Sequence, residues 1–277
     1  MIFATLFFPQ WEALQINKGS GGSRGPECGL SASEIMTIVL LYHSSNYRHL
    51  KHFYNGVVRT FLRSSFPKAP CYDHFLTLQP RIMAAMTMFM TSKLGRRNGV
   101  YYIDSTALPV CHNMRISRHK TFDGLAAKGK TSTGWFFGFK LHLVFNANYE
   151  IVAVKLTPGN VHDAVPVVSL TQGLVGKLFG DKGYLGKKLA ETLLKRGLVL
   201  MTRVRKNMKV LPMHIADKLL LNKRNMAETI IGHIKEFSSL NPPKHRSVIN
   251  ALIHITAAII AYQLNPIKPK RLVIQNS

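Results

Sequence analysis

Three acidic residues stand where a carboxylate could take part in catalysis. Asp104 ends an apolar, aromatic run that begins at Gly99, and Asp181 ends a short run that begins at Leu178. Glu228 lies on a segment with the pattern of a helix. Carboxylates are hard oxygen ligands, which a pair of Mg²⁺ ions needs for displacement at phosphorus. The three residues therefore predict a catalytic site that holds two Mg²⁺ ions, with Mn²⁺ as a substitute.

The chain is strongly basic. Its 277 residues include 37 Lys and Arg against 13 Asp and Glu, a formal net charge of +24. Such a surface attracts polyanions, of which nucleic acid is the commonest. A ribosome-associated protein or a protein that binds anionic membranes would share the charge but would not need three placed carboxylates. The hydrophobic fraction of 46% excludes a wholly disordered chain.

The remaining composition predicts a cytoplasmic protein with no membrane partner. Cys28, Cys71 and Cys111 are far apart and form no CxxC pair, so neither a zinc site nor a disulfide framework is expected. Residues 1–8 are apolar but lack the basic start of a signal peptide. The apolar run 249–262 is too short to span a bilayer and favours a buried helix. We expect the protein in the cytoplasm, associated with the nucleoid.

Four segments differ in composition. Residues 1–29 include a Gly/Ser-rich basic stretch and are predicted to be flexible or partly ordered. Residues 30–95 are predicted to form an all-helical module for DNA binding or dimerisation, opening with the capping-box pattern S-x-x-E. Residues 96–265 form the predicted catalytic domain. Residues 266–277 form a basic tail.

The order of predicted elements in the catalytic domain indicates an α/β fold. It matches a ribonuclease-H-like fold, in which a mixed five-stranded sheet is flanked by helices. The first and fourth strands would then be neighbours at the sheet centre, so Asp104 and Asp181 would share one crevice. If both acids only cap turns at strand ends, as Asp often does, they need not meet. The predicted strands are 100–104, 135–145, 151–156, 178–181 and 198–204, and the predicted helices are 163–174, 185–196, 224–240 and 247–264.

The third acid lies between two basic residues on its helix. Arg224 precedes Glu228 by four residues and Lys235 follows it by seven, so the three share one helical face. Such a face suits a substrate phosphate held beside a metal ligand. An ordinary solvated face of ion pairs would have the same spacing.

Several other residues have candidate roles. Asp163 could be a partner of the acidic site or a fourth carboxylate, but we favour a cap at the N-terminus of the following helix. The basic stretch 115–133 lacks apolar periodicity, and we expect either a loop over the active site that touches the DNA backbone or a plain surface loop. His142 shows no metal-ligand spacing and is expected to be satisfied or exposed. The basic residues predicted to contact DNA are Arg224, Lys235, Lys182, Arg115, Arg118, Lys120, Lys128 and Lys130.

Three motifs resemble those of bacterial insertion-sequence transposases of the DDE type. The motifs are YYIDST around Asp104, FGDKGY around Asp181, and Arg224-x3-Glu228-x6-Lys235, which is similar to the Tyr-Arg-Glu-Lys signature of that family. The resemblance covers residues 30–265. The signature's Tyr position holds Leu221 here. The N-terminus is also shorter than expected, which predicts weaker binding of DNA ends.

The resemblance implies a DNA transposase that works as a homodimer on transposon ends and target DNA. Water would attack a phosphodiester at each end, and the freed 3′-hydroxyl would then attack the target strand. Both steps would use the same Mg²⁺ site, held by Asp104, Asp181 and Glu228. A ribonuclease-H-like nuclease without joining activity, or a DNA-binding copy that has lost catalysis, would share the fold.

Overall fold

The computed structural model describes residues 29–132, 134–203, 214–237, 240 and 245–268. The chain divides into two compact units. The helical unit comprises residues 1–93, 237–240 and 247–264, and the sheet unit comprises residues 94–236, 241–246 and 265–277. The predicted flexible segment lies outside the described residues except for Gly29, and the basic tail does so from residue 269 onward. No described helix is long and apolar enough to cross a membrane.

The helical unit confirms the predicted N-terminal helices. Its elements are α2 (Ala32–His43), α3 (Leu50–Phe53), the π-helix η1 (Tyr54–Phe61), α4 (Tyr72–Leu78), the 3-10 helix η2 (Gln79–Ile82), α5 (Met83–Ser92) and α10 (Val248–Leu264). The predicted capping box is present at the start of α2. The backbone N–H of Glu34 donates to Ser31 Oγ at 3.3 Å, and the backbone N–H of Ser31 donates to Glu34 Oε2 at 2.7 Å.

Helix α10 belongs to the helical unit, which differs from the predicted boundary at residue 265. Ile253, Ala257 and Ile260 are fully buried in one core with side chains of α2 and α5. Asn250 also donates from Nδ2 to the carbonyl oxygen of Leu76 at 3.1 Å. An apolar helix packs where it finds complementary apolar surface, and position along the chain does not decide which surface that is.

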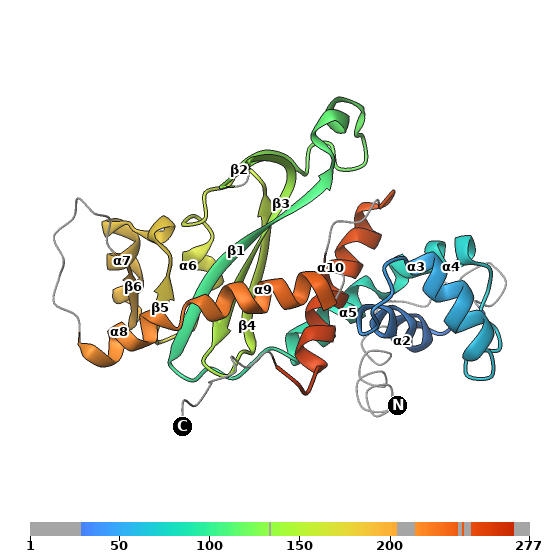
Figure 1. Ribbon diagram of the computed structural model, residues 1–277, viewed down its shortest axis with the longest axis horizontal. Helices are drawn as coiled ribbons and strands as arrows, with labels where there is room; N and C mark the ends of the chain where they lie inside the picture. The colour runs from blue at the N-terminus through green and yellow to red at the C-terminus, as the bar shows by residue number, and fades with distance from the viewer. Residues whose placement is uncertain (1–28, 133, 204–213, 238–239, 241–244, 269–277) are drawn as a thin grey trace, which may run out of the picture. The chain divides into compact units, whose positions relative to one another are not determined.

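The sheet unit confirms the predicted ribonuclease-H-like fold. Its strands are β1 (Val100–Cys111), β2 (Ala127–Thr131), β3 (Gly134–Asn146), β4 (Ile151–Pro158), β5 (Gly176–Gly180) and β6 (Leu198–Thr202). β3 pairs antiparallel with both β1 and β4, whereas β5 runs parallel to both β1 and β6. The resulting order β4-β3-β1-β5-β6 is a mixed sheet with β1 at its centre (Figure 1). β2 is an additional strand beside β3.

Strand β1 is longer than predicted, so Asp104 lies inside a strand and not at its end. Pairing with β3 continues past Asp104 as far as Cys111, opposite Phe137. The segment predicted as a loop, 115–133, contains most of the 3-10 helix η3 (Asn113–Arg118) and all of β2. Pairing across strands orders these polar and glycine-containing stretches, which carry little local signal. We call residues 109–137 the extension (Figure 1).

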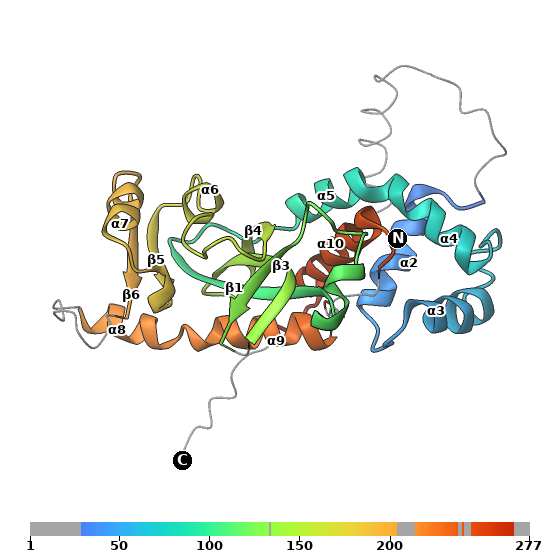
Figure 2. The same ribbon diagram turned by 90° about the horizontal axis from the view of Figure 1, so that it is seen from above.

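Helices cover both faces of the sheet. α6 (Val167–Leu170) and α7 (Lys187–Leu194) contribute to the core on the face of Tyr101 and Ile103. α9 (Asn225–Phe237) runs along the other face, after α8 (Ile215–Asn222) (Figures 1 and 2). α6 is much shorter than the predicted helix 163–174. Pro166 precedes its first residue and Gly173 has a φ of +73°, which confines the helix between them.

We expect Gly176→Ala to destabilise the sheet unit by about 2–4 kcal/mol. Gly176 opens β5 with a φ of +113°, and an added Cβ would lie 2.2 Å from the carbonyl oxygen of Gly99. Urea unfolding measures the change. Gly183→Ala is the matched control, because a Cβ there meets nothing within 4 Å. Equal unfolding midpoints for the two variants would contradict the expectation.

Candidate active site

The register of β1 and β5 brings Asp104 and Asp181 together. Tyr102 pairs with Phe179, and each acid lies two residues beyond a member of this pair. Neighbouring strands are about 4.8 Å apart, and paired residues face the same side of a sheet. The stacked rings of Tyr102 and Phe179, 5.5 Å apart, show this shared side. Both acids therefore point to the face along which α9 runs.

Glu228 reaches the same place from the first turn of α9 and is joined there by Arg224. Arg224 Nη2 lies 3.3 Å from Glu228 Oε1 and 4.0 Å from Asp181 Oδ1. The Arg224 side chain is only 13% exposed, whereas those of Asp181 and Glu228 are 52% and 65% exposed. One mostly buried guanidinium thus lies between two solvent-facing carboxylates from separate elements. Arg224 and Glu228 lie on the same side of the helix, as predicted, and are in contact. The guanidinium also reaches Asp181.

The carboxyl group of Asp104 is shielded from water and has a raised pKa. Burial raises the pKa of its carboxyl from 3.8 to about 6. The backbone N–H of Ser105, which donates to Asp104 Oδ1 at 2.8 Å, and the charge of Arg224 lower this pKa in part. Glu228 and Asp181 raise it further through repulsion. Arg224, Glu228 and Asp181 therefore all act on the charge of Asp104. Because two of these groups are acids that repel it, an added cation would be favoured at this site.

The donor set suits a hard divalent cation, but the arrangement is not that of a formed metal site. Within the described part of the chain, no three His, Cys, Asp or Glu side chains are grouped closely enough to hold a metal ion. Arg224 provides the positive charge between Asp181 and Glu228 instead. Three carboxylates that repel one another, one of them largely desolvated, still present the oxygen ligands that Mg²⁺ prefers.

We expect Asp104→Asn to stabilise the metal-free protein at neutral pH by about 1–3 kcal/mol. The carboxyl binds its proton more tightly in the folded chain, since its pKa rises from 3.8 to about 6. The tighter binding of this proton stabilises the folded chain. This stabilisation is fully present below about pH 4 and is lost as the pH rises through about 6.

Thermal unfolding in a chelator, between about pH 4 and about pH 8, tests this linkage. The wild type should lose stability relative to Asp104→Asn as the pH rises. Added Mg²⁺ should then raise the unfolding temperature of the wild type and leave that of the variant unchanged. Parallel pH profiles for the two proteins would contradict the expectation.

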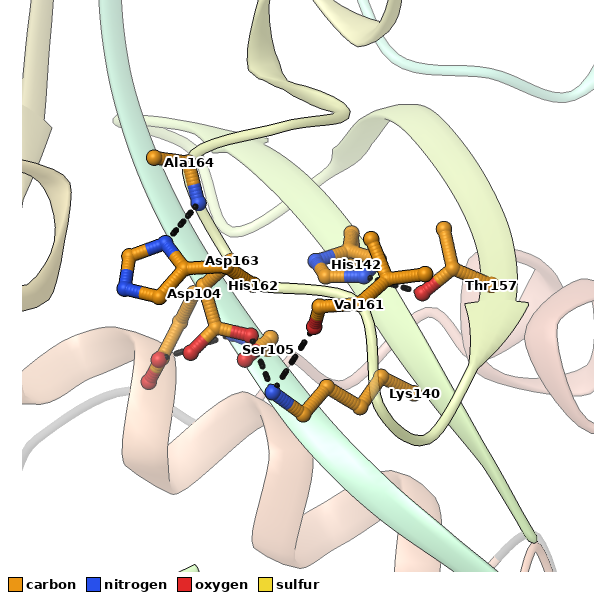
Figure 3. A network of polar contacts seen from close by, with 9 residues as sticks. All are labelled: Asp104, Ser105, Lys140, His142, Thr157, Val161, His162, Asp163 and Ala164. Atoms are coloured by element: carbon orange, nitrogen blue, oxygen red, sulfur yellow. Dashed lines mark hydrogen bonds and ion pairs between the residues drawn. The ribbon is translucent and has the colours of Figure 1, made fainter. Parts of the chain in front are cut away.

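Asp163 is paired with Lys140 (Figure 3). Lys140 Nζ donates to Asp163 Oδ1 and to the carbonyl oxygen of Val161, each at 3.0 Å. Lys140 is opposite Ala107, three residues after Asp104, so it faces away from the acidic site. The predicted helix cap is wrong, because α6 begins only at Val167 and the carboxylate is neutralised by Lys140.

His142 belongs to the same face as Lys140 and is buried, and only one of its two ring nitrogens has a hydrogen-bond partner. Its Nε2 lies 2.8 Å from Thr157 Oγ1 (Figure 3). Burial lowers the pKa of His142 to about 4, against the opposing charge of Asp163. The imidazole is therefore neutral at physiological pH and has a structural role.

The basic residues predicted to contact DNA are not grouped in one place. Lys182 is exposed in the 3-10 helix η4 (Lys182–Tyr184), directly after Asp181. Lys235 follows Glu228 on α9 by two turns, roughly 10 Å along the axis. Burial lowers the pKa of Lys235. The remaining five lie in the extension: Arg115 and Arg118 in η3, Lys120 after it, and Lys128 and Lys130 in β2.

Tyr184 is a neighbour of the acids that the sequence did not indicate. It is 2% exposed, and a Cβ added at Gly180 would lie 3.0 Å from its ring. Burial raises the pKa of the Tyr184 hydroxyl, and the charges of Asp104 and Asp163 raise it further. The only available signal was that Tyr184 closes the FGDKGY block, three residues after Asp181. Tyr184 therefore lies close enough to Asp104 for the carboxylate charge to disfavour ionisation of the phenol.

One solved transposase structure shares the fold of this chain. The chain is similar to the piggyBac transposase in a cryo-EM synaptic complex with hairpin DNA, with a TM-score of 0.54 and 9% identity over 92% of this chain and 70% of that chain. It also matches Mos1 transposase in a paired-end complex with the left transposon end, with a TM-score of 0.25 and 10% identity over 92% and 85% of the two chains. Only the first likeness is high enough to show a common fold. No curated protein matches the chain.

A family model matches most of the sheet unit. The model described as "Transposase DDE domain" covers residues 94–248, more than half of the 277-residue chain. This range contains Asp104, Asp181 and Glu228, on which the three motifs depend. Fold and sequence thus agree with the resemblance inferred from those motifs, and the chain belongs to the family of transposases with a DDE domain.

Proposed function

We propose that the protein is a DNA transposase that cleaves the 3′ ends of a mobile element and joins them to target DNA. Asp104, Asp181 and Glu228 are the proposed catalytic residues. The observation that carries the proposal is that Asp181, at the end of β5, and Glu228, on α9, contact one guanidinium. The charges of these three groups also act on Asp104 in β1. The chain has a net charge of +24, so its few acids could pair with basic residues elsewhere. A purely structural role would not require acids that repel one another to meet at a partly open site.

The same three carboxylates would hold the metal ions that DDE transposases use. Two Mg²⁺ ions, or Mn²⁺ in their place, would supply activation of the attacking oxygen and stabilisation of the leaving oxygen. Arg224 would exchange its contacts with Asp181 and Glu228 for contacts with a substrate phosphate, since a guanidinium pairs well with phosphate. Because the Arg224 side chain is mostly buried, its guanidinium would keep its position while it changes partners. Lys182, beside Asp181, would contact the adjoining phosphate.

The helical unit is the proposed module for DNA binding or dimerisation. Between residues 30 and 93 it carries seven Lys and Arg against two acids. The seven, all exposed, are Arg48, Lys51, Arg59, Arg63, Lys68, Arg81 and Lys93. Exposed cations of this kind bind phosphates without reading sequence. We propose that a homodimer brings two DNA ends together and acts in the cytoplasm at the nucleoid.

The test uses the purified chain, Mg²⁺ or Mn²⁺, and DNA that carries the sequences flanking its own gene. The expected result is metal-dependent cleavage at the 3′ ends, followed by products in which those ends are joined to target DNA. Cleavage without joined products would assign a nuclease instead. DNA binding without cleavage would assign a copy that has lost catalysis.

A further inference from the structure

The extension contains a pocket with an exposed aromatic side chain. The pocket has a volume of about 430 Å³ and is lined by Asn113, Ile116, Lys128, Trp135 and Phe136. These residues come from η3, β2 and the start of β3. Asn113 donates from Nδ2 to the carbonyl oxygen of Trp135 at 2.8 Å, which ties η3 to β3 across the pocket. The pocket is therefore part of an ordered hairpin.

Trp135 is largely exposed and lies outside the buried core. Its side chain is 62% exposed, whereas that of the neighbouring Phe136 is 6% exposed and belongs to the core. Lys130 Nζ lies 5.7 Å from the centroid of the Trp135 ring. An exposed indole beside a cation offers a stacking surface, and the ammonium can remain on the ring or contact a phosphate next to it.

The charge of the extension selects an anionic ligand. Between residues 109 and 137 the chain has five basic side chains, Arg115, Arg118, Lys120, Lys128 and Lys130, and a single acid, Asp123. Asp123 accepts a hydrogen bond from the backbone N–H of Gly124 at 3.1 Å, so its carboxylate is engaged locally. An aromatic face among lysines and arginines is the combination that binds single-stranded nucleic acid.

We propose that this pocket binds an unpaired nucleobase of DNA, with Trp135 stacked on the base and Lys128 and Lys130 on the adjoining phosphates. A paired base within a duplex has both faces covered by its neighbours and cannot stack on an indole. The ligand is therefore a single strand, a frayed end or an extruded base. The inference rests on the proposed function in one respect: the single strand would come from the DNA opened at the cleaved ends.

Tryptophan fluorescence tests the proposal directly. Trp11 and Trp135 are the two tryptophans of the chain, so Trp11→Phe leaves Trp135 as the single reporter. A thymidine oligonucleotide should quench this fluorescence saturably, and a blunt duplex of equal length should do so weakly. Absence of quenching by the single strand would overturn the proposal. Equal quenching by poly-glutamate would also overturn it, because the patch would then bind acidic protein.

Variants provide the second measurement. Trp135→Ala should weaken single-strand binding roughly 5- to 100-fold, while Trp135→Phe should retain most of the affinity and duplex binding should change little. Leu194→Ala removes another exposed apolar side chain of the sheet unit and should leave single-strand binding unchanged. Unchanged affinity in Trp135→Ala would refute the stacking role.

The two proposals can fail separately. Active cleavage with unchanged single-strand affinity in Trp135→Ala would remove the base pocket alone. Quenching by single strands in a chain that never cleaves DNA would remove the transposition chemistry and keep the pocket.

Discussion

Asp104→Asn is expected to reduce DNA cleavage by about a thousandfold or more while leaving DNA affinity nearly unchanged. The amide keeps the size of the carboxyl group and its place in β1 but loses the negative charge that would hold metal. Asp104 is also the least exposed of the three acids, since it is partly buried in β1 whereas Asp181 and Glu228 are exposed. Water cannot easily replace a ligand lost at a desolvated position.

The measurement is single-turnover cleavage of an end-containing DNA, with affinity determined in parallel by titration. Asp73→Asn, which makes the same change at an exposed position of α4, is the matched control and should cleave normally. Because Asp104→Asn is expected to be more stable than the wild type, lost cleavage could not be attributed to unfolding. Cleavage within tenfold of the wild-type rate would exclude Asp104 from catalysis.

Glu228→Gln is expected to abolish cleavage to a similar extent, for a different electrostatic reason. The substitution removes one of the two carboxylates that Arg224 bridges, at 3.3 Å, and leaves the guanidinium paired with Asp181 alone. Glu228 is 65% exposed, so the loss of its charge should hardly change the free energy of unfolding. Activity and stability should therefore separate clearly in this variant.

Glu236→Gln makes the same change two turns later on α9 and provides the control. It should retain both cleavage and DNA affinity. Wild-type cleavage by Glu228→Gln would remove this acid from the site. A parallel loss in Glu236→Gln would show that the charge of the helix as a whole, and not one position, is what matters.

Much of the fold followed from local patterns. The short apolar run before Asp181 forms β5, and Asp181 directly follows it. The alternation in residues 135–145 forms β3. Local patterns failed where pairing with a distant partner supplied the order. β1 continues through polar residues because β3 pairs with it. The helix expected at 163–174 fails for a local reason instead, since it is confined to four residues between Pro166 and Gly173.

By itself the sequence determined the class of fold and the family and predicted the three acids, because these depend on periodicity and on residues adjacent in the chain. Only the tertiary structure decided which charges meet. Arg224 reaches Asp181, 43 positions away, and Asp163 is paired with Lys140 and not with the acids. It also decided that Trp135 is exposed beside Lys130. Such contacts depend on strand register and on which face a side chain takes, and a single sequence records neither.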